Sequence, residues 1–252
     1  ASNNPLSVGS KGLPTQMLAK LKKKYISARV KFRHSFGKNL STRSGVFWAY
    51  VHYNLFDHVF LRVLWTNFSE IAQGVSRSNQ PTQKRLKSYK KSGLKTVVNL
   101  RGWDNYAHYF FEERACNYLD LKLINFKLRA RNAPTEDEIF GFLKVIERAE
   151  KPFLLHCKSG ADRAGLASTL YLMEFEGVSV ETAMKQLSFR HIHLDFTETG
   201  VIDYFFRTYK TRLEKGNIEF LDWVQYEYDA LTLQSAFDKR LPVKEALEQM
   251  RK

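Results

Sequence analysis

Two short apolar runs constrain the fold of this 252-residue chain more than any other feature of its sequence. They are residues 94–100 (LKTVVNL) and 152–156 (PFLLH), and neither shows the apolar-polar alternation of a strand with one face in water. Strands of this kind are buried on both faces, as in a parallel sheet that is covered by helices. We therefore expect both runs to lie inside such a sheet.

Helical patterns separate these runs from two further strand candidates. Thr135 and Glu138 are spaced as a capping box, which marks the start of a helix, and Gly93 marks the end of another. Strands that alternate with helices predict an α/β fold, with a central, mostly parallel sheet flanked by helices on both faces. Residues 179–250 are predicted to be mostly helical. The other expected elements are strands at residues 71–75 and 121–128 and helices over residues 81–92, 105–118, 135–149 and 164–176.

The excess positive charge of the chain lies toward its N-terminal end. Residues 1–56 hold ten Lys or Arg and no Asp or Glu, and so carry most of the formal net charge of +14 of the chain. Such a basic arm is attracted to polyanions, including an anionic membrane surface, although a solvated tail accounts for the same composition. No nucleic-acid-binding motif accompanies the charge, so nucleic acid is not favoured as a partner.

Residues 46–65 (VFWAYVHYNLFDHVFLRVLW) follow the arm and have the period of an amphipathic helix. The apolar positions that recur at steps of three or four are Ala49, Tyr53, Phe56, Phe60 and Val63. One interpretation is a helix packed on the domain. The other is an interfacial helix that lies among lipid headgroups beside the basic arm.

Hydropathy and cysteine content bear on the location of the chain. No stretch of 18 or more apolar residues is free of charge, so no transmembrane helix is predicted, and no secretory signal is visible. The two cysteines, Cys116 and Cys157, do not make a disulfide framework. A working thiolate needs a reducing compartment, so we expect a cytoplasmic protein, attached peripherally to a membrane if residues 1–65 bind one. Cys116 is expected to be a small buried hydrophobe.

The residues that carry chemistry form the sequence HCKSGADRAG at 156–165, between an apolar strand and a helix. A loop that closes onto a helix N-terminus points its backbone N–H groups inward and forms a cup for an anion. Gly160 permits the tight turn, and the planar fork of Arg163 matches two oxygens of a phosphoryl group. The helix dipole and the nearby cation favour the thiolate of Cys157, which is a good nucleophile.

This sequence resembles the Cys-x5-Arg phosphate loop of the protein tyrosine and dual-specificity phosphatases. Residues 74–102, which contain GVSRSNQPT and GLKTVVNLRG, and residues 198–209 (ETGVIDYFFRTY) are similar to dual-specificity-type phosphatases of bacteria. The similarity spans roughly residues 68–210. It implies a protein-tyrosine-phosphatase-like fold and a phosphomonoester hydrolase with a phosphocysteine intermediate, which uses no metal and no other cofactor.

The resemblance also implies a role for each residue of the loop. Cys157 is the expected nucleophile, Arg163 binds the phosphoryl group and stabilises the transition state, and His156 supports the loop by hydrogen bonding. The expected phosphate-binding residues are Lys158, Ser159, Gly160, Ala161, Asp162 and Arg163. The expected domains are the basic arm with its amphipathic helix at 1–65, the phosphatase domain at 66–215 and a helical C-terminal extension at 216–252.

The chain departs from the family pattern where a general acid is expected. Residues 127–133 (KLRARNA) occupy that region and hold no carboxylate, although an alkoxide leaving group needs a proton. Asp162 resembles the loop aspartate of myotubularin- and Sac-type lipid phosphatases and is the predicted acid. A role as a helix cap is the alternative for Asp162. The other candidate acids are Glu136, Asp137 and Glu138, at the start of the following helix.

Ala164 is a second departure. Many relatives have Ser or Thr at this position, and the hydroxyl stabilises the departing thiolate when the phosphoenzyme is hydrolysed. Ala164 has no hydroxyl, so we predict slow hydrolysis of the intermediate. The two departures together leave an alternative, a pseudophosphatase that binds phosphate without turnover.

The substrate expected from these features is a phosphoprotein, with phosphate on Tyr, Ser or Thr, or a lipid or glycolipid phosphate. Lys158 follows the cysteine, at a place where the tensin-type lipid phosphatases also have lysine. The basic, aromatic-bearing N-terminus favours the lipid alternative as well. The sequence does not decide between the two classes.

Five further residues are weaker candidates. Arg101, Arg129 and Arg131 either line the entrance of the pocket or are solvated surface residues. His191 and His193 alternate as metal ligands on a strand do, but we interpret them as a surface pair and predict no metal site.

Overall fold

The computed structural model describes residues 20, 24, 27, 42–56 and 65–250. The chain divides into two compact units, Ala1–Phe56 and Asp57–Lys252. The main described element of the first unit is helix α2 (Arg43–Phe56), which corresponds to the beginning of the helix predicted over residues 46–65. Residues 57–64 lie outside the described residues, and the interfacial role of this helix stays a prediction. Within the described ranges, none of the helices has the length and hydropathy needed to cross a bilayer.

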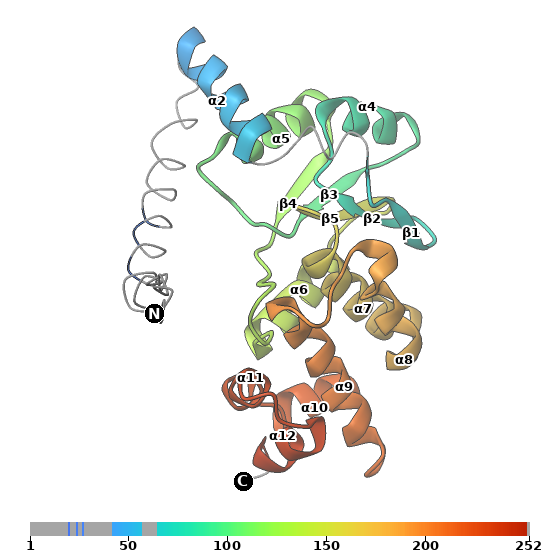
Figure 1. Cartoon of the computed structure of the whole chain (residues 1–252). Coiled ribbons are helices and arrows are strands. Elements are labelled where there is room, and N and C mark those ends of the chain that lie inside the picture. Colours follow the sequence, from blue (N-terminus) through green and yellow to red (C-terminus); the bar gives the residue numbers. More distant parts are fainter. Residues whose placement is uncertain (1–19, 21–23, 25–26, 28–41, 57–64, 251–252) are drawn as a thin grey trace, which may run out of the picture. The chain divides into compact units, whose positions relative to one another are not determined.

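The second unit contains a five-stranded sheet with the order β1-β2-β5-β3-β4 (Figure 1). Strands β2, β5, β3 and β4 pair in parallel, and β1 pairs with β2 in the antiparallel direction. The mostly parallel sheet that the sequence predicts is therefore confirmed. The strands are β1 (Ser69–Ala72), β2 (Val75–Asn79), β3 (Thr96–Asn99), β4 (Lys122–Asn125) and β5 (Phe153–Cys157).

One strand prediction is wrong in detail. A single strand was expected at residues 71–75, but the chain turns at residues 73–74 and makes a hairpin of β1 and β2. Gly74 has a φ of 72°, a left-handed conformation that glycine adopts without the steric cost of a side chain. This turn gives β2 its place next to β5 in the sheet.

Helices cover both faces of the sheet, as predicted. Figure 1 shows α4 and α5 on one side and α6 and α7 on the other. The four helices are α4 (Gln83–Lys91), α5 (Ala107–Tyr118), α6 (Glu136–Glu147) and α7 (Asp162–Glu176). The remaining elements are α8 (Val180–Ala183), η1 (Met184–Gln186), η2 (Phe189–His191), η3 (Glu198–Gly200), α9 (Val201–Leu213), α10 (Phe220–Tyr226), α11 (Ala230–Asp238) and α12 (Val243–Met250), which confirm the helical C-terminal part.

The burial of β5 on both faces explains why its sequence does not alternate between apolar and polar residues. Leu154 packs in a core cluster with residues of α4 and α5, while Phe153 and Leu155 pack in a second cluster with residues of α6 and α7. Both faces of the strand are thus apolar, as expected for a covered parallel sheet. Cys116 on α5 belongs to the first cluster, so its prediction as a buried small hydrophobe is confirmed.

The C-terminal helices share the second core cluster. Trp223 of α10, Leu233 of α11 and Ala246 of α12 are buried there together with residues of β5 and α7. The Tyr228 hydroxyl also donates a hydrogen bond to the carbonyl of Pro134, 2.7 Å away. The proposed boundary between residues 215 and 216 stays a prediction.

The sheet places its functional edge at the carboxyl end of β5. This strand lies between β2 and β3, and Cys157 is its last residue. In open α/β sheets, ligands bind beyond the carboxyl ends of the strands where the strand order reverses. Helix α7 begins at Asp162, two residues before the predicted start, so Asp162 and Arg163 lie in its first turn.

The capping box of α6 yields a stability prediction. The Thr135 hydroxyl accepts a hydrogen bond from the Glu138 N–H at 3.3 Å, and the Glu138 carboxylate accepts one from the Thr135 N–H at 3.0 Å. Thr135→Ala should lower the free energy of unfolding by about 1 kcal/mol, measured by urea denaturation. The control, Leu231→Ala at an exposed position of α11, should change it by less than about 0.5 kcal/mol. Equal midpoints for the two variants would contradict the assigned cap.

Candidate active site

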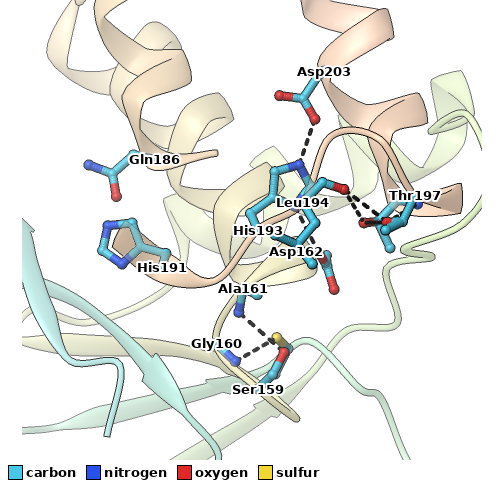
Figure 2. A network of polar contacts seen from close by, with 12 residues as sticks. Ser159, Gly160, Ala161, Asp162, Gln186, His191, His193, Leu194, Thr197 and Asp203 are labelled. Carbon is cyan, nitrogen blue, oxygen red and sulfur yellow. Dashed lines mark hydrogen bonds and ion pairs between the residues drawn. The ribbon is translucent and has the colours of Figure 1, made fainter. Parts of the chain in front are cut away.

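The loop between β5 and α7 holds its glycine against the neighbouring strand. Gly160 has a φ of 75°, and a Cβ atom there would lie 2.6 Å from the backbone N of Asn79 on β2. No side chain larger than hydrogen fits at this position unless β2 moves. The close approach bends the loop so that the Gly160 N–H donates to the Cys157 sulfur at 3.3 Å (Figure 2).

Arg77 holds the loop from outside. Its side chain is fully buried on β2, and Nη2 donates to the carbonyls of Gly160 and Ala161 at 2.5 and 3.0 Å. Nη1 donates to the carbonyl of Gln186 at 2.7 Å. Burial lowers the pKa of Arg77 to about 10, while nearby Cys157 opposes that shift, so the guanidinium is charged at neutral pH. Because it binds carbonyl oxygens, the amide N–H groups of the same peptides face the other side of the loop.

His156 reaches the opposite face of the sheet. Its imidazole is fully buried, and Nε2 lies 2.9 Å from the Oε1 of Glu112 on α5, although the angle is not that of a hydrogen bond. The other carboxylate oxygen of Glu112 accepts a hydrogen bond from the Gln80 side chain at 3.1 Å. These contacts fix the residue that precedes the cysteine, and they are compatible with the supporting role proposed for His156.

Arg163 lies in the first turn of α7. Its Nε is buried and, among the described residues, has no hydrogen-bond partner. A buried guanidinium nitrogen without a partner is costly, so a group that supplies an acceptor there is favoured. The structure thus brings residues 157–163, which the sequence predicts for the site, together in the loop and the first turn of α7. The Arg163 Nε–H is available there as a donor for a bound anion.

Asp162 contacts His193, which was expected on the surface. The Asp162 Oδ1 lies 2.8 Å from the Nδ1 of His193, and the Nε2 of His193 lies 2.5 Å from the Oδ2 of Asp203 on α9 (Figure 2). Burial alone would lower the pKa of His193, but the two carboxylates outweigh it and raise the pKa to about 9. At neutral pH, His193 is therefore an imidazolium that donates to both carboxylates.

The expected surface pair of histidines is wrong. His191 and His193 are both buried. His191 Nδ1 lies 3.0 Å from the Asn67 side-chain oxygen, while the Asn67 amide donates to the carbonyls of Ser159 and His191. Burial and nearby Arg77 lower the pKa of His191 to about 4, so it is neutral at physiological pH. Within the described ranges, no three or more His, Cys, Asp or Glu residues are grouped to hold a metal ion.

The arginines considered for the entrance have protein partners. Arg129 makes two hydrogen bonds to Glu138, at 2.9 and 3.0 Å. The same glutamate is part of the capping box of α6. Arg131 lies 3.4 Å from Glu198, and Arg101 donates to the Gln80 side chain. Glu138, one of the alternative acids, is therefore engaged twice.

Sequence reasoning missed the residues that hold the loop from a distance. Arg77 carries the one usable signal, because an arginine in the middle of a five-residue strand needs a specific partner if it is buried. The others have no local signature. They are Asn67, Glu112, Gln186 and Asp203.

A family comparison agrees with this geometry. The model of a family described as a DSP-PTPase phosphatase fused to NAD+ kinase matches residues 66–198, just over half of the chain. The chain therefore belongs to this family, and it is a cysteine-dependent phosphatase of the dual-specificity and protein-tyrosine-phosphatase-like superfamily. The sequence-based expectation of the family and of the enzyme class is confirmed. No curated protein matches the sequence.

Solved structures of similar chains include TpbA from P. aeruginosa, which is 18% identical with a TM-score of 0.48 and covers 69% of this chain and 91% of its own. The active form of Tk-PTP is 20% identical with a TM-score of 0.46 and covers 61% of this chain and 99% of its own. PTPMT1 is 16% identical with a TM-score of 0.43 and covers 59% and 99%. The fold assignment rests on the strand order and helix layers described above.

The two buried histidines should give opposite pH dependences of stability. The pKa of His193 is raised from 6.5 to about 9, so its stabilisation is complete below about pH 6.5 and is lost as the pH rises through 9. The pKa of His191 is lowered from 6.5 to about 4, so its contribution is present above about pH 6.5 and is lost as the pH falls through 4.

Urea denaturation at several pH values tests both. The stability difference between wild type and His193→Gln should shrink by up to about 3 kcal/mol between pH 6.5 and 9. The difference between wild type and His191→Gln should instead shrink as the pH falls from 6.5 toward 4. Curves that stay parallel over these ranges would contradict the assigned contacts.

Proposed function

We propose that this chain hydrolyses phosphomonoesters through a covalent phosphate on Cys157. The observation that carries the proposal is the loop between β5 and α7. There the Gly160 N–H faces the Cys157 sulfur, and the buried Arg163 Nε has no hydrogen-bond partner in the part of the chain that the structure describes. A phosphoryl group in this loop has amide donors and a guanidinium available for its oxygens. Such preorganised donors stabilise charge in the transition state.

In the first half-reaction the Cys157 thiolate attacks phosphorus. The S–P bond forms as the P–O ester bond breaks, and the electron pair of that bond leaves with the substrate oxygen. Arg163 and the loop amides bind the three remaining phosphoryl oxygens throughout. His156 keeps the end of β5 in place from the α5 side of the sheet.

The leaving oxygen needs one proton, and we assign its delivery to Asp162. The proton comes from the Nδ1 of the His193 imidazolium, 2.8 Å from the Asp162 carboxylate, and passes through that carboxylate to the leaving oxygen, while Asp203 keeps the ring in place through Nε2. The pair gives up one proton to the alkoxide. A water molecule then attacks the phosphocysteine and returns a proton to the pair, while the P–S bond breaks and inorganic phosphate and the thiolate are released.

In this proposal the loop binds only the phosphoryl group of the substrate, so several substrate classes fit it. Phosphate on a Tyr, Ser or Thr side chain and phosphate on a lipid or glycolipid head group both satisfy it. The basic residues 1–65 are attracted to an anionic membrane surface, and the proposed peripheral location at a membrane follows from this attraction. Nucleic acid is not proposed as a partner.

Pre-steady-state kinetics with p-nitrophenyl phosphate test the intermediate. Wild type should release a burst of nitrophenol, up to one per enzyme, because Ala164 provides no hydroxyl for hydrolysis of the phosphocysteine. Cys157→Ser should lose both the burst and turnover. Ala164→Ser, at a buried position, should raise the steady-state rate and reduce the burst. A wild type that binds inorganic phosphate but releases no nitrophenol would instead identify a phosphate-binding pseudophosphatase.

Leaving-group dependence tests Asp162. Asp162→Asn should slow hydrolysis of an alkyl phosphate by about 10²–10³-fold, because an alkoxide needs the proton. The same variant should change hydrolysis of p-nitrophenyl phosphate much less, since nitrophenolate leaves without one. Asp203→Asn is the comparison variant: it removes one carboxylate from His193 but keeps that of Asp162, so it should slow the alkyl phosphate less than Asp162→Asn does. Rates equal to wild type on both substrates would remove Asp162 from this role.

A further inference from the structure

A short segment beside the phosphate loop exposes three large apolar side chains. Phe189, Ile192 and Phe196 are 78%, 48% and 81% exposed, and we call them the apolar tip. Single exposed apolar residues are normal on protein surfaces, but three within eight residues are a local concentration. All three belong to the stretch between α8 and α9, whose helical turns are the short 3-10 turns η1, η2 and η3.

The backbone holds the tip in this position. Ile192 has a φ of 56°, which a β-branched residue adopts only at a steric cost. Such a conformation persists when the surrounding structure imposes it. Here the residues on either side are anchored: the carbonyl of His191 accepts a hydrogen bond from Asn67, and the ring of His193 is bound to two carboxylates. The exposure of Ile192 is therefore built into the fold.

The same anchors connect the tip to the catalytic loop. His193 follows Ile192 directly, and its ring contacts Asp162 of the phosphate loop, as Figure 2 shows. A cavity of about 260 Å³ lies between Phe189 and Phe196, and the ring of His193 forms part of its wall. His193 thus lies between this cavity, which two phenylalanines and several polar side chains line, and Asp162 of the phosphate loop.

The charges around the tip favour an anionic surface as its partner. Lys185 and Arg190 are exposed, and the described part of the chain gives neither an ion pair. The carboxylates near the tip in sequence have cationic partners, since Asp195 pairs with Arg207 at 2.9 Å and Glu198 lies 3.4 Å from Arg131. Aromatic and aliphatic side chains flanked by cations are the composition of segments that enter the interface of an anionic bilayer.

We propose that the apolar tip enters the headgroup region of an anionic phospholipid bilayer and that the phosphatase acts on a phosphorylated lipid head group there. The proposal rests on the phosphatase activity proposed above. It does not require the N-terminal arm, because the tip belongs to the second unit of the chain. A lipid that carries its phosphate at the membrane surface would meet the catalytic loop while the tip holds the enzyme at that surface.

Vesicle co-sedimentation tests the docking step with the full chain. The vesicles are phosphatidylcholine alone or phosphatidylcholine mixed with phosphatidylglycerol, in low salt and in about 0.5 M NaCl, which screens the basic arm. The test variant is Phe189→Ser with Phe196→Ser. The matched control is Tyr226→Ser with Leu231→Ser, which removes two side chains of similar exposure from the C-terminal helices.

Wild type and the control should bind the anionic vesicles in both salt conditions. The tip variant should lose about tenfold or more of its affinity in high salt, where apolar insertion provides most of the remaining binding. Equal binding of the tip variant and wild type in high salt would overturn the proposal. The binding measurement needs no enzymatic activity. It therefore tests membrane docking even if the chain proves not to hydrolyse phosphomonoesters.

Hydrolysis assays test the substrate class. The tip variant should cleave p-nitrophenyl phosphate as wild type does, because neither phenylalanine belongs to the catalytic loop, and this also shows that it is folded. Its rate on phosphatidic acid and phosphatidylinositol phosphates in vesicles should fall about tenfold or more. If the tip variant loses hydrolysis of phosphopeptides while its rate on vesicles is unchanged, the tip is a protein-docking surface and the proposal is wrong.

Discussion

The shape of the catalytic loop depends on the buried guanidinium of Arg77. A charge without solvent is tolerated only where it is hydrogen-bonded, and Arg77 meets this condition with the carbonyls of Gly160, Ala161 and Gln186. Because a peptide unit is planar, a carbonyl that turns toward Arg77 directs the attached N–H of the next residue away from it. The loop carbonyls therefore face Arg77, and the N–H groups of the same peptides face the opposite side, where the anion would bind. Gly160 completes it, since only a residue without a Cβ fits so close to β2.

Electrostatics around the loop follow from the same arrangement. Arg77, Arg163 and the imidazolium of His193 place positive charge on several sides of the loop, while Asp162 is the carboxylate at its edge. The field therefore favours an anion in the cup even before any substrate-specific contact. The opposite pKa shifts of His191 and His193 show how local this field is. Two residues separated by one position differ because one faces Asn67 and Arg77, and the other faces two carboxylates.

Much of the fold and the center of the site could be predicted from the sequence, because their signals are local. The apolar runs identify β3 and β5, Thr135 and Glu138 identify the start of α6, and the spacing of Cys157 and Arg163 identifies the loop. What could not be predicted depends on distant contacts. Arg77 and Gly160 are 83 positions apart, and Asn67 and Ser159 are 92 apart, so no local pattern joins them. His193 was misplaced for the same reason, since its spacing from His191 indicates nothing about burial.

The alternation of side chains along β5 has a mechanical consequence. His156 and Cys157 are neighbours in sequence, but one points into the layer of α5 and the other toward α7. A single peptide unit thus separates Cys157 from His156, whose ring lies 2.9 Å from the Glu112 carboxylate on the other side of the sheet. We expect a substitution at Glu112 on α5 to shift the Cys157 sulfur, because it removes the contact that holds the neighbouring His156 ring. The position of the sulfur therefore depends on packing in both helix layers, and not on the loop alone.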